Sequence, residues 1–237
     1  IFLRNALQIN PNYDFALTNL GAVLNELDKL DEGERCLRKA LSINSSSPMA
    51  LNNLGNILSN IKNNKEAELC YRKAIEIKSD FSLAYNNLGS LLSKEGNLIE
   101  AEKFTEKAIN FNPKFELAYV NLGSIKIDLD KLKEAEELLL SAIKINENYS
   151  YAYRNLFRLY EKTNKISKLK NKIDSLKENK NIFNEIMMFK ARICFREKDF
   201  ITAKKLIDQV SDIWVKNTDH STNLLYWSFK AFIEEKV

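Results

Sequence analysis

The sequence is poor in the residues that interrupt regular structure. Its 237 residues include only three Pro and six Gly. A β-sandwich or a doubly wound sheet needs more turn residues than that, because each of its many short elements ends in a turn. The hydrophobic share of 45% and the charged share of 29% are typical of a folded globular chain. The composition therefore favours long helices.

Residues for chemistry and for disulfides are also scarce. The single histidine, His220, has no second His or Cys at metal-ligand spacing, and the sequence contains no phosphate-binding loop and no clear Ser/His/Asp set. The three Cys form no CxxC pattern. We therefore predict no enzyme activity, no cofactor and no metal site, with free thiols in a reducing compartment, most simply the cytoplasm.

Hydropathy, the start of the chain and its net charge bear on the class of protein. No run of about 18 apolar residues is present, so we expect no membrane span. The chain begins at Ile1 without Met and shows no secretory signal, and we expect it to be a fragment. The 36 basic and 32 acidic residues nearly balance, so the net charge of +4 does not argue for nucleic acid or a membrane surface.

An internal repeat organises the chain. Asn-Leu-Gly occurs at 19–21, 53–55, 87–89 and 121–123, and Asn-Leu-Phe follows at 155–157, always 34 residues apart. Alanine recurs in phase, 19 residues after each Gly, at Ala40, Ala74, Ala108 and Ala142. A fixed period of this length is typical of a repeat array rather than of one closed core.

These residues resemble the tetratricopeptide repeat family, whose unit is a 34-residue helix–turn–helix. Pro11 and Pro113 match the family's proline after the second helix, and the match is strong to about residue 160 and weaker beyond. The resemblance implies an all-α solenoid, a right-handed superhelix whose concave groove is lined by the first helix of each repeat. We expect fourteen helices in one array, with a partial repeat at 1–13, four regular repeats at 14–149, two divergent repeats at 150–217 and a terminal helix at 218–237.

The recurring glycine predicts a close helix–helix contact. Gly in the middle of a helix costs about 1 kcal/mol, so we expect a neighbouring helix to need the space and the alanine columns to be its other side. Phe157 replaces this Gly in the fifth repeat, which predicts a change of curvature near residues 157–183.

A column of asparagines precedes the glycines and is the first candidate site. Asn is common in this chain, at 28 positions, but these share one phase of the repeat. The column consists of Asn19, Asn53, Asn87, Asn121, Asn155 and Asn223. Asn52, Asn56 and Asn86 are expected beside it on the same helices.

Two interpretations of this column stay open. A side-chain amide can bind both the C=O and the N–H of a peptide unit, so the column can hold an extended backbone. In this it resembles the asparagine ladder in the repeat arm of O-GlcNAc transferase. Alternatively, each Asn only bonds a neighbouring helix.

Arginine gathers at the other end of the expected groove. Four of the chain's eight Arg lie there, namely Arg154, Arg158, Arg192 and Arg196. Arg binds carboxylates bidentately, so this cluster predicts an acidic peptide segment or an acidic partner surface. Local salt bridges, for instance to Glu161, are the alternative.

The sequence thus predicts a protein-interaction scaffold that binds an extended peptide or a partner segment. The alternative is the substrate-recognition arm of a larger glycosyltransferase or sulfotransferase. Binding of RNA through a helical-repeat code is disfavoured by the modest charge and the amide-rich groove. The terminal helix is apolar nearly all round, which predicts self-association or packing on another chain.

Overall fold

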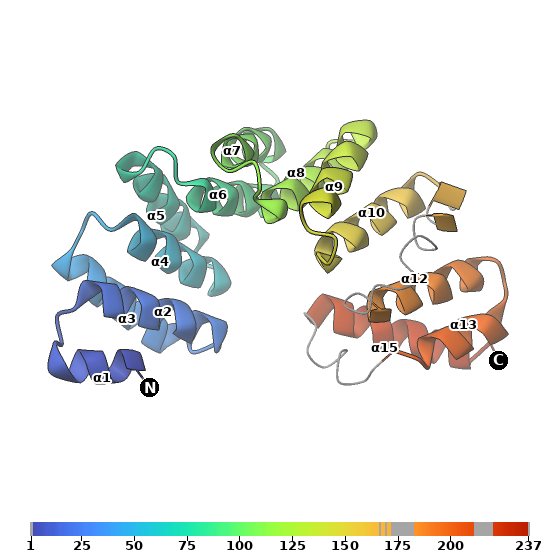
Figure 1. Ribbon diagram of the computed structural model, residues 1–237, viewed down its shortest axis with the longest axis horizontal. Helices are drawn as coiled ribbons and strands as arrows, with labels where there is room; N and C mark the ends of the chain where they lie inside the picture. The colour runs from blue at the N-terminus through green and yellow to red at the C-terminus, as the bar shows by residue number, and fades with distance from the viewer. Residues whose placement is uncertain (1, 166, 169, 172–182, 211–219, 237) are drawn as a thin grey trace. The chain divides into compact units, whose positions relative to one another are not determined.

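The computed structural model describes residues 2–165, 167, 168, 170, 171, 183–210 and 220–236. Within these residues the chain forms thirteen α-helices and no strand (Figure 1). Contacts divide it into two compact units, Ile1–Lys131 and Leu132–Val237. The prediction of an all-α helical solenoid is confirmed.

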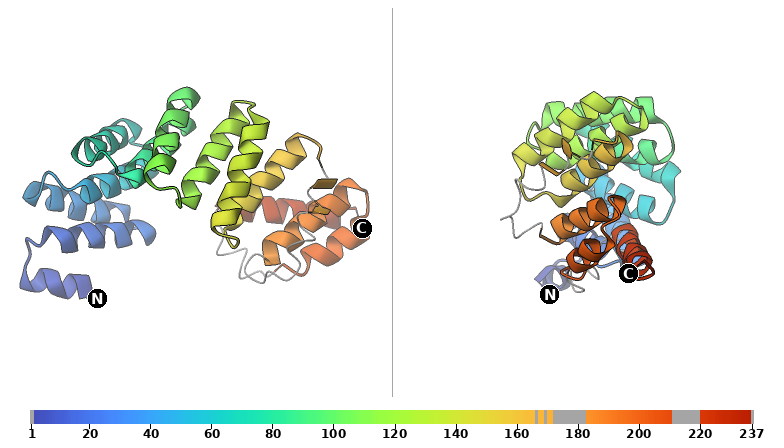
Figure 2. Two further views of the ribbon diagram at one scale, coloured as in Figure 1. Left: turned by 45° about the horizontal axis from the view of Figure 1, so that its top comes forward. Right: turned by 90° about the vertical axis from the view of Figure 1, so that its right-hand side faces the viewer.

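The first unit is a series of antiparallel helix pairs. Its helices are α1 (Phe2–Ile9), α2 (Asp14–Glu26), α3 (Leu30–Ile43), α4 (Pro48–Asn60), α5 (Asn64–Ile77), α6 (Ser82–Lys94), α7 (Leu98–Phe111) and α8 (Glu116–Asp128). Each pair packs on the next, so that α2 contacts α4, α4 contacts α6 and α6 contacts α8. Figure 2 shows the same order of pairs from two further directions.

The second unit continues the helical pattern. It contains α9 (Leu132–Ile145), α10 (Ser150–Lys162), α12 (Phe183–Arg196), α13 (Phe200–Ile207) and α15 (His220–Glu234). In this unit α10 packs on α9, α12 on α10, α13 on α12 and α15 on α13. The expected second helix of the fifth repeat falls largely on residues 172–182, outside the described residues, as does the predicted change of curvature there.

The turn between the two helices of each repeat has one backbone conformation. A residue with positive φ recurs every 34 positions, at Asp28, Lys62, Gly96, Asp130, Asn164 and Lys198. At Lys62 the backbone N–H bonds the carbonyl of Ser59, and the next N–H, of Asn63, bonds that of Leu58. Such a left-handed residue satisfies the last carbonyls of a helix. The period therefore persists to residue 198, where the sequence columns have faded.

The glycine columns face side chains other than those expected. A Cβ on Gly21 would lie 2.5 Å from Cγ of Leu37, and one on Gly55 would lie 2.6 Å from Cε1 of Tyr71. Both partners stand 16 residues after their glycine. The alanine columns fill the core but are not the nearest neighbours of these two glycines. The expected close contact is present, and its partner is this third column on the second helix.

Ion pairs tie the second helices of the first unit together. Arg4 Nη2 lies 2.8 Å from Glu32 Oε1, Arg38 Nη2 lies 2.7 Å from Glu66 Oε1, and Arg72 Nη2 lies 2.8 Å from Glu100 Oε1. The three pairs repeat with the 34-residue period and join each second helix to the next. These groups are partly exposed, so each pair contributes only about 0–1 kcal/mol.

Candidate functional site

A polar hollow lies on the first helices of three consecutive pairs. It has a volume of about 250 Å³ and is lined from α2, α4, α5 and α6. Its lining residues are Asn25, Asn56, Ser59, Asn60, Tyr71, Asn87, Ser90, Leu91 and Lys94.

The local sequence of α4 fixes which of its faces is polar. The helix begins with Pro48 in its first turn, and the side chain of Ser47 accepts a hydrogen bond from the backbone N–H of Ala50. Leu54 and Leu58 are 3% and 0% exposed and point into the core. With that stripe buried, the helical period leaves Asn56 and the residues around it to line the hollow.

Amide hydrogen bonds link neighbouring first helices. Asn87 Nδ2 donates to Asn52 Oδ1 at 3.0 Å, and Asn121 Nδ2 donates to Asn86 Oδ1 at 2.9 Å. The two bonds are equivalent, because each joins residues 35 apart. They stabilise the buried polar groups that the stack encloses.

The same network fixes the orientation of Asn56. Its Oδ1 accepts from the hydroxyl of Tyr71 at 2.8 Å and from Asn87 Nδ2 at 3.0 Å, which occupies both lone pairs. Burial raises the pKa of Tyr71 well above its ordinary value, so its hydroxyl stays protonated and donates. The Nδ2 group of Asn56 has no hydrogen-bond partner among the described residues and is free for a ligand.

The remaining polar groups of the hollow add further donors. Asn60 Nδ2 donates to Asn25 Oδ1 at 2.9 Å, which leaves Nδ2 of Asn25, a donor, and Oδ1 of Asn60, an acceptor, without a partner among the described residues. The hydroxyl of Ser90 and the ammonium of Lys94 line the same hollow. The surface therefore offers the amide N–H donors of Asn56 and Asn25, one positive charge and a single amide oxygen at Asn60, and it suits a ligand rich in acceptors.

Family profiles described as tetratricopeptide repeat match residues 14–80, 70–103 and 117–149. The chain belongs to the tetratricopeptide repeat family. No match is found among curated proteins.

Solved tetratricopeptide-repeat proteins share the fold. A structure of Pseudomonas aeruginosa pilF is 22% identical, covers 92% of this chain and 96% of its own, and has a TM-score of 0.70. A tetratricopeptide repeat protein from Parabacteroides merdae is 16% identical, covers 98% and 90% of the two chains, and has a TM-score of 0.73. YrrB, described as having an unusual peptide-binding site, is 18% identical over 85% of this chain and 95% of its own, with a TM-score of 0.54.

Within this repeat fold, the asparagine column divides into different roles. Asn19, Asn53, Asn87 and Asn121 are half-buried on α2, α4, α6 and α8. Asn155 instead donates to the backbone carbonyl of Tyr151 in its own helix at 2.9 Å. The side chain of Asn223 lies outside the described residues.

Two of the predicted neighbours lie deeper than expected. Asn52 and Asn86 are 3% and 1% exposed, beneath the face of the repeats rather than on it. Each accepts the amide of the next repeat, at Asn87 and Asn121, so their place is in the contact between helices. Of the three flanking asparagines only Asn56 lines the hollow.

The predicted arginines are held mainly by local partners. Arg192 Nη2 lies 2.7 Å from Glu161 Oε2, and Arg196 Nε lies 3.9 Å from Glu161 Oε1. Arg154 lies over the ring of Tyr151, with its Cζ 4.2 Å from the centroid. Arg158 is exposed on α10. The second unit thus brings Arg192 and Arg196 together around one carboxylate.

Sequence reasoning missed the contributions of Tyr71 and Asn25. Tyr71 belongs to the second helix of its repeat and reaches the hollow only by crossing Gly55. The sequence held one signal for it. The equivalent positions in the repeats before and after are Leu37 and Thr105, so Tyr71 is the one of these three with an aromatic hydroxyl. Asn25 lies outside the repeating asparagine column.

The cysteines offer no reactive thiolate. Cys36, Cys70 and Cys194 are free. Burial raises the pKa of Cys70 to about 11, so this group is a neutral thiol at pH 7. The same cause raises the pKa of the other two.

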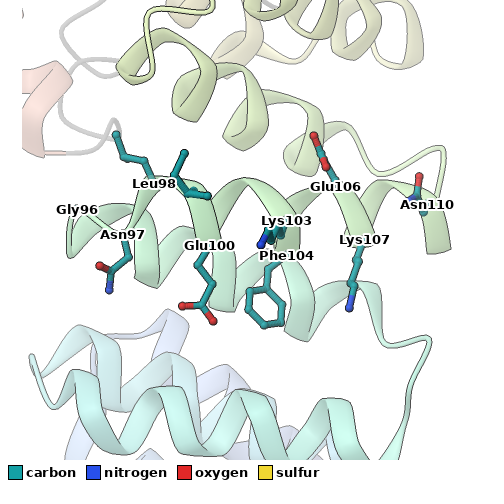
Figure 3. A pocket seen from close by; sticks show the side chains of 10 residues that line it. Gly96, Asn97, Leu98, Glu100, Lys103, Phe104, Glu106, Lys107 and Asn110 are labelled. Atoms are coloured by element: carbon teal, nitrogen blue, oxygen red, sulfur yellow. The ribbon is translucent and has the colours of Figure 1, made fainter.

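A larger hollow, of about 890 Å³, runs along α7 (Figure 3). Leu98 and Glu106 point to one side of the helix, and Glu100, Phe104 and Lys107 point to the other. Its lining comes from Gly96 to Asn110 and mixes both signs of charge without a convergent set of donors or acceptors. Size alone does not make it the better site.

Two negative findings apply to the described residues. None of the described helices is long and apolar enough to cross a membrane. Among the same residues no group of three or more His, Cys, Asp or Glu is placed to hold a metal ion.

Proposed function

We propose that this tetratricopeptide-repeat protein is a non-catalytic scaffold that binds an extended segment of a partner protein along the first helices of its first unit. The repeat fold is that of a protein-interaction scaffold. The observation that supports the finer proposal is the set of N–H donors in the hollow, above all the amide of Asn56.

The spacing of the repeats suits an extended chain. First helices that pack about 10 Å apart meet one donor group for every three residues of a peptide that rises about 3.3 Å per residue. The donors would bind backbone carbonyls, so the face would hold many sequences. The peptide-binding site attributed to YrrB, which has a similar fold, is consistent with this use.

Backbone-modified peptides test the proposal. A peptide selected by panning on this chain would be resynthesised with single N-methylated or single reduced amide bonds. N-methylation removes a donor and should be tolerated at the carbonyls that face the hollow. Reduction of the same amide removes the acceptor and should weaken binding about tenfold. This is the expected cost of losing one hydrogen bond between uncharged groups.

An isosteric substitution gives the protein side of the test. Asn56→Asp keeps the shape and replaces the two N–H donors by an acceptor, and it should abolish capture of the peptide. Asn12→Asp makes the same change in an exposed turn of the same unit and should leave capture unchanged. Equal binding by the two variants would refute the proposal.

A further inference from the structure

We propose that the second unit holds a separate pocket that takes a peptide segment in which an aromatic side chain stands next to a carboxylate. The pocket is formed by α10, α12 and α15 and has a volume of about 330 Å³. It is lined by Glu161, Met188, Arg192, Phe195, Arg196 and Phe229. This inference rests on the proposed peptide-binding function and gives the second unit its own ligand chemistry.

One part of the pocket is apolar. Phe195 meets Phe229 edge to face, with centroids 5.4 Å apart, and Phe200 and Phe232 pack on the same ring at 5.1 and 5.3 Å. Met188 adds a polarisable thioether, a group that contacts aromatic rings favourably. The volume is at the lower end of the range for ligand sites and suits one large side chain.

The other part carries two guanidinium groups that are bound to different degrees. Arg192 is fixed, because it lies over the Phe157 ring at 4.7 Å and bonds Glu161 at 2.7 Å. Arg196 is only within 3.9 Å of Glu161, and its side chain is 47% exposed. Arg196 therefore retains N–H donors for a second carboxylate.

The charge balance favours an acidic ligand. Among the residues that line the pocket, Arg192 and Arg196 share the one carboxylate of Glu161, which leaves an excess of one positive charge. Burial lowers the pKa of Arg192, and the neighbouring charge of Arg196 lowers it further. A carboxylate from a ligand would offset both effects, and it would bind Arg196 with the bidentate geometry that guanidinium groups favour.

The same residues explain where the repeat pattern breaks. Phe157 stands in the glycine column and Phe189 interrupts the asparagine column, and their rings stack with centroids 4.4 Å apart. This stack supports the guanidinium of Arg192. The substitutions at these two column positions thus provide the ring on which Arg192, a lining residue of the pocket, lies.

The three methionines allow a direct test. They are Met49 in the first unit and Met187 and Met188 in the second, and only Met188 lines the pocket. The chain would be labelled with ¹³C at the methionine methyl groups and titrated with an end-blocked Gly-Ser-Asp-Phe-Asp-Ser-Gly peptide. We expect the ring of the peptide to shift the Met188 methyl signal and to leave the Met49 signal in place.

Matched peptides and variants separate the two parts of the pocket. Replacing the peptide's Phe by Ala should remove the shift, and replacing both Asp by Asn should weaken binding about tenfold. Arg196→Gln should weaken binding of the acidic peptide by a similar factor. Lys205→Gln removes one positive charge from an exposed site on α13 and should have no effect.

Each contrary outcome overturns the inference. These are an unmoved Met188 signal at millimolar peptide, equal binding by the Arg196→Gln and Lys205→Gln variants, and a shift caused by adenosine monophosphate but not by the peptide. The Asn56→Asp variant separates this inference from the proposed function, since it should leave the Met188 response intact. If the Met188 methyl signal stays unmoved while the first unit captures its peptide normally, the inference about this pocket is refuted and the proposed function stands.

Discussion

The ring of Tyr71 lies so close to Gly55 that a Cβ on the glycine would stand 2.6 Å from Cε1. Because Gly55 has no side chain, the Tyr71 ring can extend from α5 across α4 and place its hydroxyl 2.8 Å from Asn56 Oδ1. Gly55 therefore serves the packing of two helices and also makes room for the group that orients the candidate site.

Removing the Tyr71 hydroxyl should affect stability and binding together. In Tyr71→Phe the ring still fills the space beside Gly55, but Asn56 Oδ1 loses one of the two groups that donate a hydrogen bond to it. We expect the free energy of unfolding to fall by about 1 kcal/mol and peptide capture to weaken, because the amide of Asn56 is no longer held. Urea unfolding and a peptide-binding titration measure the two effects. Tyr119→Phe, whose hydroxyl bonds the carbonyl of Pro113 at 3.3 Å away from the hollow, is the control and should change neither by much.

A methyl group at Gly55 should destabilise the repeat even though alanine favours helices. The propensity gain is about 1 kcal/mol, whereas overpacking a closed contact costs about 1–3 kcal/mol. Gly55→Ala should thus lower the urea midpoint of the unmodified chain. In a Tyr71→Ala background, which is itself destabilised by loss of the buried ring, the same change should cost less, because the atoms that crowd the new methyl group are gone. The double-mutant cycle gives the coupling energy between the two sites. Strict additivity of the two changes would contradict the contact.

Glycine should be the more stable residue at two of the left-handed turn positions. Lys62 has φ of 67° and Gly96 has φ of 85° at equivalent positions. Lys62→Gly should raise the free energy of unfolding by up to about 1 kcal/mol, and Gly96→Ala should lower it by about 1–2 kcal/mol. A Cβ on Gly96 would meet no atom within 4 Å, so the second change isolates the backbone term. Lys73→Gly, on an exposed face inside α5, should be destabilising and shows that added glycine is not favourable in general.

A buried ion pair should make the first unit sensitive to acid. Lys126, 6% exposed, bonds Glu102, and Lys131 Nζ lies 2.8 Å from the same Oε1. Burial alone would raise the pKa of Glu102, but the two ammonium groups outweigh it and hold the pKa below the ordinary value of 4.5. The ion pair's contribution is therefore complete above pH 4.5 and is lost as the pH falls through the lowered pKa.

Substitution should show the asymmetry of this pair. Glu102→Gln removes the nearer countercharge of the buried Lys126 ammonium, leaves it Glu106 Oε1 at 3.6 Å and should cost about 3 kcal/mol. Lys126→Met leaves Glu102 paired with Lys131 and should cost much less. Unfolding curves at pH 7 and pH 4 give both comparisons. The acid-induced loss should be smaller in Glu102→Gln than in the unmodified chain. An equal loss would mean that other carboxylates cause the acid sensitivity.

The repeat register was predictable because it follows from short-range periodicity. The Asn-Leu-Gly columns located the first helices, and Gly96 with Asn97 marked one of the turns. The positive φ at Lys62 or Lys198 was not predictable from residue type, since lysine has no preference for that conformation. The helix ends impose it through the carbonyls that must be satisfied.

The sequence by itself determined the helical repeat, its period and the columns that lie on the first helices, because these depend on local spacing along a regular helix. The tertiary structure decided what the column residues do. Asn52 and Asn86 became buried acceptors, Asn155 turned to its own backbone, and Asn56 kept free donors because Tyr71 crosses Gly55. Arg192 became fixed on the Phe157 ring, while the guanidinium of Arg196 kept N–H donors for a ligand. A side-chain hydrogen bond depends on the distance and angle between atoms of different helices, and only the packing of those helices sets that geometry.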